Sequence, residues 1–528
     1  MKYLVLFFMF ITLCYKTKIS LHMLQQNLYN ENNRYIKWLL KNMNVFLGAE
    51  LVIIPLIAIY NIYPKIILYI MYIVFSIMYI FVAIKNINAI KNSQQKKPLV
   101  VTKRIKRLIC TIVIVYMIPI ILFIFNIIGF KYLLLIESIM VYLNFVVVGL
   151  CCLINYPVER CVYYYYKNKA VSKLKSMENL KVVGITGSYG KTSSKNILND
   201  ILSIKYNVLP SPLNYNTHYG LMITINNYMD KFTDIFIAEM GAYVKGEIKG
   251  MCNLVHPKYG ILTNIGTAHL ESFGSEENIQ KGKFELIESL PEDGIGVLNR
   301  DDPKQVNYDV KTKAKLLWIG IDNIDVDVRA VDIKTNYKGT KFKVVFKGDK
   351  TKYEFETKLL GKHSIYNILA GIALGREFGI SIEDLQKSVK GVRAVEHRLE
   401  LKKLGNFYMI DDAYNSNPIG AKSALDVLGM MPGIKVVVTP GMIELADKED
   451  ELNEIFGTQI AEVADYAILI GEKKTKPIYK GLIKAGYDKD NIIIYNNVKE
   501  AYGFINTLTG DKEVYALFEN DLPDTYSE

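Results

Sequence analysis

Long apolar runs dominate the first part of the chain. Four of them approach the length of about 20 apolar residues that a membrane-spanning helix needs, at residues 45–63, 66–84, 108–130 and 132–156. A shorter run at residues 3–15 is compatible with a further span, an interfacial helix or the core of a signal peptide. The pattern predicts a transmembrane region over residues 1–156 with four or five helices, and a juxtamembrane linker over residues 157–180.

Beyond residue 180 short apolar runs alternate with stretches of helical periodicity, which is typical of an α/β fold. Strands are expected at residues 182–186, 235–238, 259–264, 296–299 and 315–320, then at 407–411, 434–439, 466–470 and 491–495. Residues 326–358 alternate as antiparallel strands do. The pattern predicts a central domain over residues 181–395 and a Rossmann-like α/β domain over residues 396–528.

Positive charge belongs to the membrane region. Residues 1–170 hold 19 Lys and Arg but only four Asp and Glu, so the net charge of +11 does not indicate nucleic-acid binding. Five basic residues follow the short run at 3–15, and eight lie at residues 85–107. The two short turns, after the runs at 45–63 and 108–130, hold only Lys65 and Lys131. Because basic loops face the cytoplasm, the residues after the last span are expected there. Cleavage of a signal peptide would put them outside, which disfavours cleavage.

The spans carry little charge. No Asp, Lys or Arg lies near their centres, and Glu50 and Glu137 lie at or near their ends. Charge inside a span usually marks a transport pathway. Its scarcity favours a membrane anchor or a platform for a lipid substrate over a transporter, and no signature of an ABC transporter is found.

A phosphate-binding loop follows the first predicted strand of the central domain. Residues 186–193 read T-G-S-Y-G-K-T-S and precede a helical pattern. Glycines let backbone N–H groups turn toward a phosphate, and the helix N-terminus adds partial positive charge. Lys191 would reach the β- and γ-phosphates, and the Thr192 hydroxyl would bind Mg²⁺. The loop is a variant of the general pattern G-x-x-x-x-G-K-[ST].

Two further groups follow strand ends, where an α/β sheet presents ligands to its binding crevice. Glu239 directly follows the strand expected at residues 235–238, and its carboxylate is a hard oxygen ligand of the kind that Mg²⁺ prefers. His269 follows the next strand, although a lone histidine is usually structural. Lys281 and Lys283 lie where a helix is expected over residues 282–290, and surface lysines are the ordinary interpretation.

Several stretches together resemble the Mur ligase family, the ATP-dependent amide ligases of peptidoglycan precursor synthesis. The resemblance covers about half of the chain and is strongest to the branch that adds D-alanyl-D-alanine to the UDP-muramoyl tripeptide. The matching stretches lie at residues 186–193, 214–220, 238–248, 268–275, 361–367 and 411–417.

The resemblance implies ATP and Mg²⁺ as cofactors and a role for each matched residue. Catalysis is implied for Lys191, His269 and Lys283, and Mg²⁺ binding for Thr192, Glu239, His269 and Lys283, the last as a carbamylated lysine. Nucleotide binding is implied for Gly187, Ser188, Gly190, Lys191, Thr192, Ser193, Asn299, Asn367, Arg398 and Asp412. Phosphorylation of a carboxylate by ATP would give an acyl phosphate that an amine attacks, a reaction that needs alignment and charge neutralisation.

Two departures from the family bear on the substrates. Apolar spans stand where the family has an N-terminal domain that binds the UDP group, which makes a lipid-linked cell-wall precursor plausible beside a small-molecule one. Gly441 stands where the D-alanyl-D-alanine-adding enzymes usually have Asp, and the chain end is acidic rather than basic. The amine, an amino acid or a dipeptide, therefore stays open. The alternatives are a membrane-bound poly-γ-glutamate-type synthetase and a membrane scaffold with a relict ATPase domain.

Overall fold

The structure is a computed structural model with two compact units, residues 1–165 and residues 166–528. It describes residues 2–27, 29, 33–43, 50–59, 65–92, 98–267, 270–395, 397–413, 418–443, 445, 448–508, 510 and 512–520.

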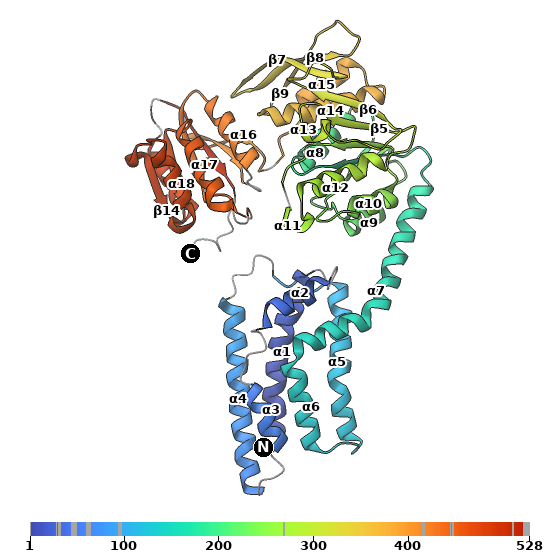
Figure 1. The fold of residues 1–528 in the computed structure, drawn as a ribbon, viewed down its shortest axis with the longest axis vertical. Coiled ribbons are helices and arrows are strands. Elements are labelled where there is room, and N and C mark those ends of the chain that lie inside the picture. Colours follow the sequence, from blue (N-terminus) through green and yellow to red (C-terminus); the bar gives the residue numbers. More distant parts are fainter. Residues whose placement is uncertain are drawn as a thin grey trace. The chain divides into compact units, whose positions relative to one another are not determined.

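The described part of the first unit is helical (Figure 1). Its helices are α1 (Lys2–Gln26), α2 (Arg34–Lys41), α3 (Glu50–Ile59), α4 (Lys65–Asn92), α5 (Lys103–Ile124), α6 (Phe130–Tyr142) and α7 (Asn144–Lys175), which continues into the second unit. Four helical segments among the described residues are long and apolar enough to cross a membrane: Tyr3–Gln26, Tyr69–Asn88, Lys103–Ile124 and Asn144–Lys175.

Two of these segments agree broadly with the predicted runs at residues 66–84 and 108–130, whereas the other two differ from the prediction. The short run at residues 3–15 belongs to the 25-residue helix α1, which continues past Lys16. The Lys16 side chain is buried, and its ammonium donates a hydrogen bond to the carbonyl oxygen of Tyr142. The run at 45–63 contains a described helix of only ten residues, α3, with residues 44–49 and 60–64 outside the description. The apolar run is therefore a poor guide to where these helices begin and end.

The run at 132–156 is not a single helix either. It divides between α6 and α7, next to Asn144. The Asn144 side chain accepts a hydrogen bond from the Ser20 hydroxyl (2.6 Å) and donates one to the Thr17 hydroxyl (3.0 Å). These bonds give a polar residue inside an apolar run partners on α1, which its burial requires. Helix α7 then continues through most of the predicted linker, to Lys175.

The central domain contains a nine-stranded sheet, as its alternating pattern predicts. Its strands run in the order β2-β3-β1-β4-β5-β6-β7-β8-β9, parallel from β2 to β7 and antiparallel at β8 and β9. They are β1 (Lys181–Thr186), β2 (Val208–Pro210), β3 (Ile235–Glu239), β4 (Tyr259–Leu262), β5 (Ile295–Asn299), β6 (Lys315–Gly320), β7 (Val328–Asn336), β8 (Gly339–Phe346) and β9 (Tyr353–Thr357). Only the three-residue β2 was not predicted.

Helices cover both faces of this sheet (Figure 1). Helices α8 (Lys191–Leu202), α14 (Lys362–Glu377) and α15 (Ile382–Gly391) share one apolar core with it. Helices α9 (His218–Asn227), α10 (Glu247–Val255) and α12 (Glu276–Glu288) pack together, and α12 contacts β1 and β4; α11 (Leu270–Phe273) and α13 (Pro303–Val306) are short. Strand β1 lies between β3 and β4, where the strand order reverses. A parallel sheet binds ligands at such a point, beyond the carboxyl ends of its strands.

The C-terminal domain has a six-stranded sheet in the order β10-β11-β15-β12-β13-β14, of which only β10 is antiparallel. Its strands are β10 (Glu400–Leu404), β11 (Phe407–Asp412), β12 (Ile434–Thr439), β13 (Tyr466–Ile470), β14 (Ile492–Tyr495) and β15 (Val514–Glu519). Helices α16 (Pro418–Gly429), α17 (Glu449–Ala461) and α18 (Glu472–Lys484) form a core on one face, and α19 (Val498–Thr507) packs on the other. The sequence did not predict β10 or the central strand β15.

Two glycines let α17 and α18 approach closely. A Cβ atom on Gly457 would lie 2.2 Å from the carbonyl oxygen of Ile478, and one on Gly481 would lie 2.0 Å from that of Glu454. Both neighbours are backbone atoms, so only movement of a helix would make room for a methyl group.

We therefore expect Gly457→Ala to destabilise the C-terminal domain by about 1–3 kcal/mol, the usual cost of overpacking. The matched control is Gly503→Ala in α19, where no atom lies within 4 Å of the added Cβ. The control should be neutral or stabilise by about 0.5–1 kcal/mol, because alanine favours a helix. Thermal unfolding of the full chain in detergent measures both. Equal effects of the two substitutions would show that α17 and α18 do not meet at these glycines.

Candidate active site

The phosphate loop joins β1 to α8, as predicted, and requires its glycines. Gly187 has φ +154°, and a Cβ there would lie 2.0 Å from the Thr263 hydroxyl. Gly190 precedes α8 with φ +77°, in the left-handed region that favours glycine. Asn264, which follows β4, fixes the loop through two hydrogen bonds of 2.9 Å. Its carbonyl oxygen accepts one from the Ser188 amide, and its side-chain oxygen accepts the other from the Tyr189 amide.

Lys191 bends back over this loop. Its ammonium donates hydrogen bonds to the carbonyl oxygens of Gly187 (2.8 Å) and Ser188 (3.2 Å). Burial lowers the pKa of Lys191; the Glu239 carboxylate opposes this shift, and the Arg398 guanidinium adds to it. The charge of Arg398, a residue of the C-terminal domain, thus acts on the pKa of Lys191 in the loop. Lys191 is in place to meet an anion there.

The Glu239 carboxylate, at the end of β3, has several polar partners. It is 1% exposed. The Thr192 hydroxyl lies 3.2 Å from both of its oxygens, and the Asn216 side-chain amide donates to one of them at 3.1 Å. The ammonium of Lys195 lies 2.9 Å from the other oxygen and also donates to the carbonyl oxygen of Leu213 (2.8 Å). Both side chains of this ion pair are buried.

Lys195 was missed from the sequence. It lies one helical turn beyond Lys191 and Thr192 on α8, on the side that faces β3. The available signal was a lysine among the buried positions of an amphipathic helix, which needs a carboxylate partner. A helical lysine is usually solvent-exposed, so the pattern alone gave no reason to choose it.

Two side chains with oxygen atoms lie together beside the phosphate loop. The Thr192 hydroxyl and the Glu239 carboxylate meet beside the phosphate loop, and both are of the hard oxygen type that this ion prefers. His269 lies outside the described residues, as does the end of the 411–417 stretch, residues 414–417. Among the residues that the structure does describe, no group of three or more His, Cys, Asp or Glu side chains could hold a metal ion.

Lys283 is buried in the middle of α12, not near a helix start as the sequence suggested. The helix begins at Glu276, because the Ser275 hydroxyl caps it by accepting a hydrogen bond from the Asn278 amide. Lys283 is 1% exposed, whereas Lys281 is exposed. Burial, with a smaller effect of the Lys191 charge, lowers the pKa of Lys283 to about 7. Much of this amine is therefore uncharged at neutral pH.

The two asparagines that the resemblance assigns to the nucleotide lie on β5 and α14. Asn299 ends β5, and its side-chain oxygen accepts a hydrogen bond from the Asp301 amide (3.0 Å). Asn367 lies beside the loop: its side-chain amide nitrogen is 3.8 Å from the position that a Cβ atom on Gly190 would take. The structure thus brings Asn367 next to the phosphate loop and holds Asn299 in a turn after a neighbouring strand.

Asp412 ends β11 in the C-terminal domain and accepts a hydrogen bond from the Leu399 amide (3.2 Å). Burial raises the pKa of Asp412 to about 6, and the Arg398 charge opposes this shift. Arg398 and Asp412, which the sequence singles out together, are therefore electrostatic neighbours. Ser193, the last predicted loop residue, lies in the first turn of α8.

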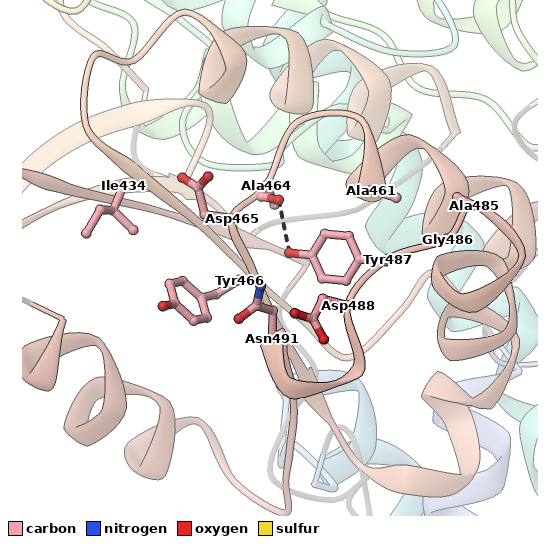
Figure 2. Close-up of a pocket in the computed structure, with 10 residues that line it drawn as sticks. All are labelled: Ile434, Ala461, Ala464, Asp465, Tyr466, Ala485, Gly486, Tyr487, Asp488 and Asn491. Atoms are coloured by element: carbon pink, nitrogen blue, oxygen red, sulfur yellow. Dashed lines mark hydrogen bonds between the residues drawn. The ribbon is translucent and has the colours of Figure 1, made fainter.

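A cavity of about 550 Å³ lies elsewhere in the C-terminal domain (Figure 2). Its lining includes Ile434, Tyr466 and Asn491, which lie at or just before the starts of β12, β13 and β14. The Tyr487 hydroxyl closes one side by donating to the carbonyl oxygen of Ala464 (3.0 Å). The cavity is at the amino ends of these strands, so it belongs to the edge of the sheet opposite to Asp412.

Known proteins match this chain over the same two domains. Residues 185–375 match the Mur ligase middle domain, and residues 397–517 match the Mur ligase glutamate ligase domain. A UDP-N-acetylmuramoyl-tripeptide–D-alanyl-D-alanine ligase of Bacillus subtilis is 34% identical over 61% of this chain and 68% of its own length. The enzyme of that name from Escherichia coli is 31% identical over 54% of this chain and 62% of its own length.

Solved structures agree with these matches. The MurF ligase of Thermotoga maritima in complex with ADP superposes with a TM-score of 0.60 at 26% identity, over 67% of this chain and 79% of that one. A MurF structure from Acinetobacter baumannii gives a TM-score of 0.61 at 25% identity, over 67% and 77%. The fold, the phosphate loop and these matches confirm the resemblance: the chain belongs to the Mur ligase family of ATP- and Mg²⁺-dependent, amide-bond-forming ligases.

Proposed function

We propose that the chain is a membrane-anchored ligase of cell-wall synthesis that joins an amine, D-alanyl-D-alanine or a related one, to a carboxylate on a muramoyl-peptide precursor. The observation that carries this proposal is the phosphate loop with Lys191, Thr192 and Glu239 converging on it. The matches to UDP-N-acetylmuramoyl-tripeptide–D-alanyl-D-alanine ligases support the branch.

The chemistry follows from these residues. The backbone amides at the start of α8 and the Lys191 ammonium bind the phosphates of ATP, and a Mg²⁺ held by Thr192 and Glu239 would neutralise phosphate charge. Transfer of the γ-phosphoryl group to the acceptor carboxylate gives an acyl phosphate and ADP. The amine attacks the acyl carbon, which forms the amide and releases phosphate and a proton. His269 is assigned to the same Mg²⁺ chemistry by resemblance alone.

The first unit supports a membrane-proximal acceptor. The family model of the middle domain begins to match at residue 185, and four helical segments among the described residues between Tyr3 and Lys175 are long and apolar enough to cross a membrane. We propose that this unit spans the membrane, that the catalytic domains face the cytoplasm, and that the precursor is lipid-linked. Basic residues at 85–107 support that orientation.

The amine remains the least constrained substrate. Gly441 has φ +90°, and a Cβ there would lie 3.2 Å from the Asn453 side-chain oxygen. The backbone thus disfavours the Asp that the D-alanyl-D-alanine branch usually carries here. Glu519, buried at the end of β15, stands next to Asp412 on β11. An amine other than D-alanyl-D-alanine would fit these differences.

We propose that Lys283 carries the family's carbamate. A neutral amine is the form that adds to CO₂, with loss of a proton, and the lowered pKa of Lys283 supplies that form at neutral pH. The resulting carboxylate would offer the oxygen donors that an ammonium lacks.

The proposed reaction predicts a specific product. The full chain, purified in detergent with ATP, Mg²⁺ and D-alanyl-D-alanine or another amine, is offered UDP-linked and lipid-linked muramoyl tripeptide. We expect ADP release and a product heavier by the amine less one water, formed faster from the lipid-linked acceptor. Lys191→Ala should lower this rate by about 10²–10³-fold, because a charge contact of the transition state is lost. An undiminished rate in Lys191→Ala, or no amide from any pair, would contradict the proposal.

Lys283→Ala should lose most activity, whereas Lys281→Ala, two residues away and exposed, should keep it. In the wild type we expect activity to fall as the pH drops below about 7, since protonation of Lys283 removes the amine that binds CO₂. A carbamate signal in ¹³C NMR after addition of ¹³C-bicarbonate should appear in the wild type and in Lys281→Ala but not in Lys283→Ala. An inactive Lys281→Ala beside a fully active Lys283→Ala would show that the wrong lysine was assigned.

A further inference from the structure

Helix α9 and the turn after it expose large apolar side chains. Four of them lie within 14 residues of chain and are 51%, 41%, 52% and 66% exposed: Tyr219, Ile223, Tyr228 and Phe232. We call these four residues the α9 patch. The opposite side of the helix is buried in the domain through Leu221, Met222 and Ile225. The helix is therefore apolar on both sides, although one of them faces solvent.

Such a surface calls for an explanation. Exposed apolar side chains that stand singly are normal, whereas a group of them usually marks a binding surface. Tyr219 and Ile223 are four residues apart on the helix and so share one face. The phosphate loop and the Glu239 contacts make no use of any of the four.

The immediate neighbour of the patch is the end of α7. The Asn226 side chain, on α9, donates a hydrogen bond to the carbonyl oxygen of Tyr166 (3.0 Å), and the Lys173 ammonium donates one to the carbonyl oxygen of Met229. Thus α9 is tied to the last turns of the helix that contains the fourth candidate span.

The same region is basic. Helix α7 carries Lys167, Lys169, Lys173 and Lys175 in its last turns, and the Lys231 ammonium lies 5.0 Å from the centre of the Phe232 ring. Aromatic side chains mixed with lysines are characteristic of protein surfaces at the membrane–water interface. Anionic lipids of the cytoplasmic leaflet attract such basic segments.

We propose that the α9 patch docks on the surface of the membrane, with its aromatic rings among the lipid head groups and the neighbouring lysines, Lys231 and those at the end of α7, against anionic lipid. This inference rests on the membrane anchoring proposed above. Hydrophobic insertion and charge together give stable binding where either alone is weak. The docking would hold the central domain at the bilayer, where a lipid-linked acceptor is presented.

The test uses the full chain in lipid nanodiscs of phosphatidylcholine and phosphatidylglycerol. The photo-crosslinking residue p-benzoylphenylalanine replaces Phe232 or Tyr219 in separate variants. The matched control replaces Ile324, which is 78% exposed in the loop between β6 and β7. A fourth variant replaces Ile114, an exposed residue of the candidate span in α5, and reports insertion itself. Mass spectrometry then identifies lipid adducts after illumination.

We expect lipid adducts at positions 232, 219 and 114 and none above background at 324, with lower yields at 232 and 219 when phosphatidylglycerol is omitted. Adducts at 114 without adducts at 232 and 219 would overturn the docking and leave the anchoring intact. Absence of adducts at all positions, 114 included, would overturn both. Crosslinked dimers of the chain at 232 in place of lipid adducts would show that a second copy covers the patch, which also contradicts the proposal.

Discussion

The arrangement of the active site depends on one buried ion pair. Lys195 and Glu239 are both almost fully buried, and their charged atoms lie 2.9 Å apart. Each charge would be costly to bury alone, and removing one partner of such a pair typically costs about 3–5 kcal/mol. The pair joins α8, which begins at the phosphate loop, to β3, which ends in the proposed magnesium ligand. It also holds the segment before α9, because Lys195 donates to the Leu213 carbonyl oxygen.

Around the phosphate loop, this arrangement places several amines close to one another and to the Glu239 carboxylate. Lys191 and Lys195 lie near the buried Glu239 carboxylate, the Lys191 charge acts on Lys283, and burial lowers the pKa of both Lys191 and Lys283. Binding of ATP with its metal would change this balance, since phosphate charge would meet Lys191. A carbamate on Lys283 would remove one positive charge and add a negative one. The surplus of buried amines thus suits a site that receives a highly charged nucleotide.

Local patterns predicted the α/β half of the chain well. Strands β6, β12 and β13 agree with the sequence to the residue, because each is a short apolar run bounded by turn residues. Strand β15 was missed, since its pairing partners β11 and β12 are far away in the sequence. The helical unit was harder. Lys16 and Asn144 have partners on other helices, so polarity in the sequence gave wrong ends.

In the site too, local patterns were predictable from the sequence and contacts between distant residues were not. Lys191, Thr192 and Glu239 were predictable because a loop pattern and a strand end place them, and the structure brings them together. Lys195 was not predictable, because its role comes from its ion pair with Glu239, and nothing in a helical sequence pattern indicates that contact. The local pattern did not separate Lys281 from Lys283: the family resemblance singled out Lys283, and the packing of α12 then leaves Lys283 buried and Lys281 exposed.

The ion pair can be measured most directly by a double-mutant cycle on local stability. Hydrogen–deuterium exchange of the β3 and α8 amides reports their opening free energy in the full chain, for Lys195→Met, Glu239→Gln and the double variant. Each single change should lower this free energy by about 3–5 kcal/mol, because an unpaired charge is left buried. The double variant should lose clearly less than the sum of the two single losses, with a coupling of about 2 kcal/mol or more. Losses that simply add would contradict the claim that this pair holds the site together.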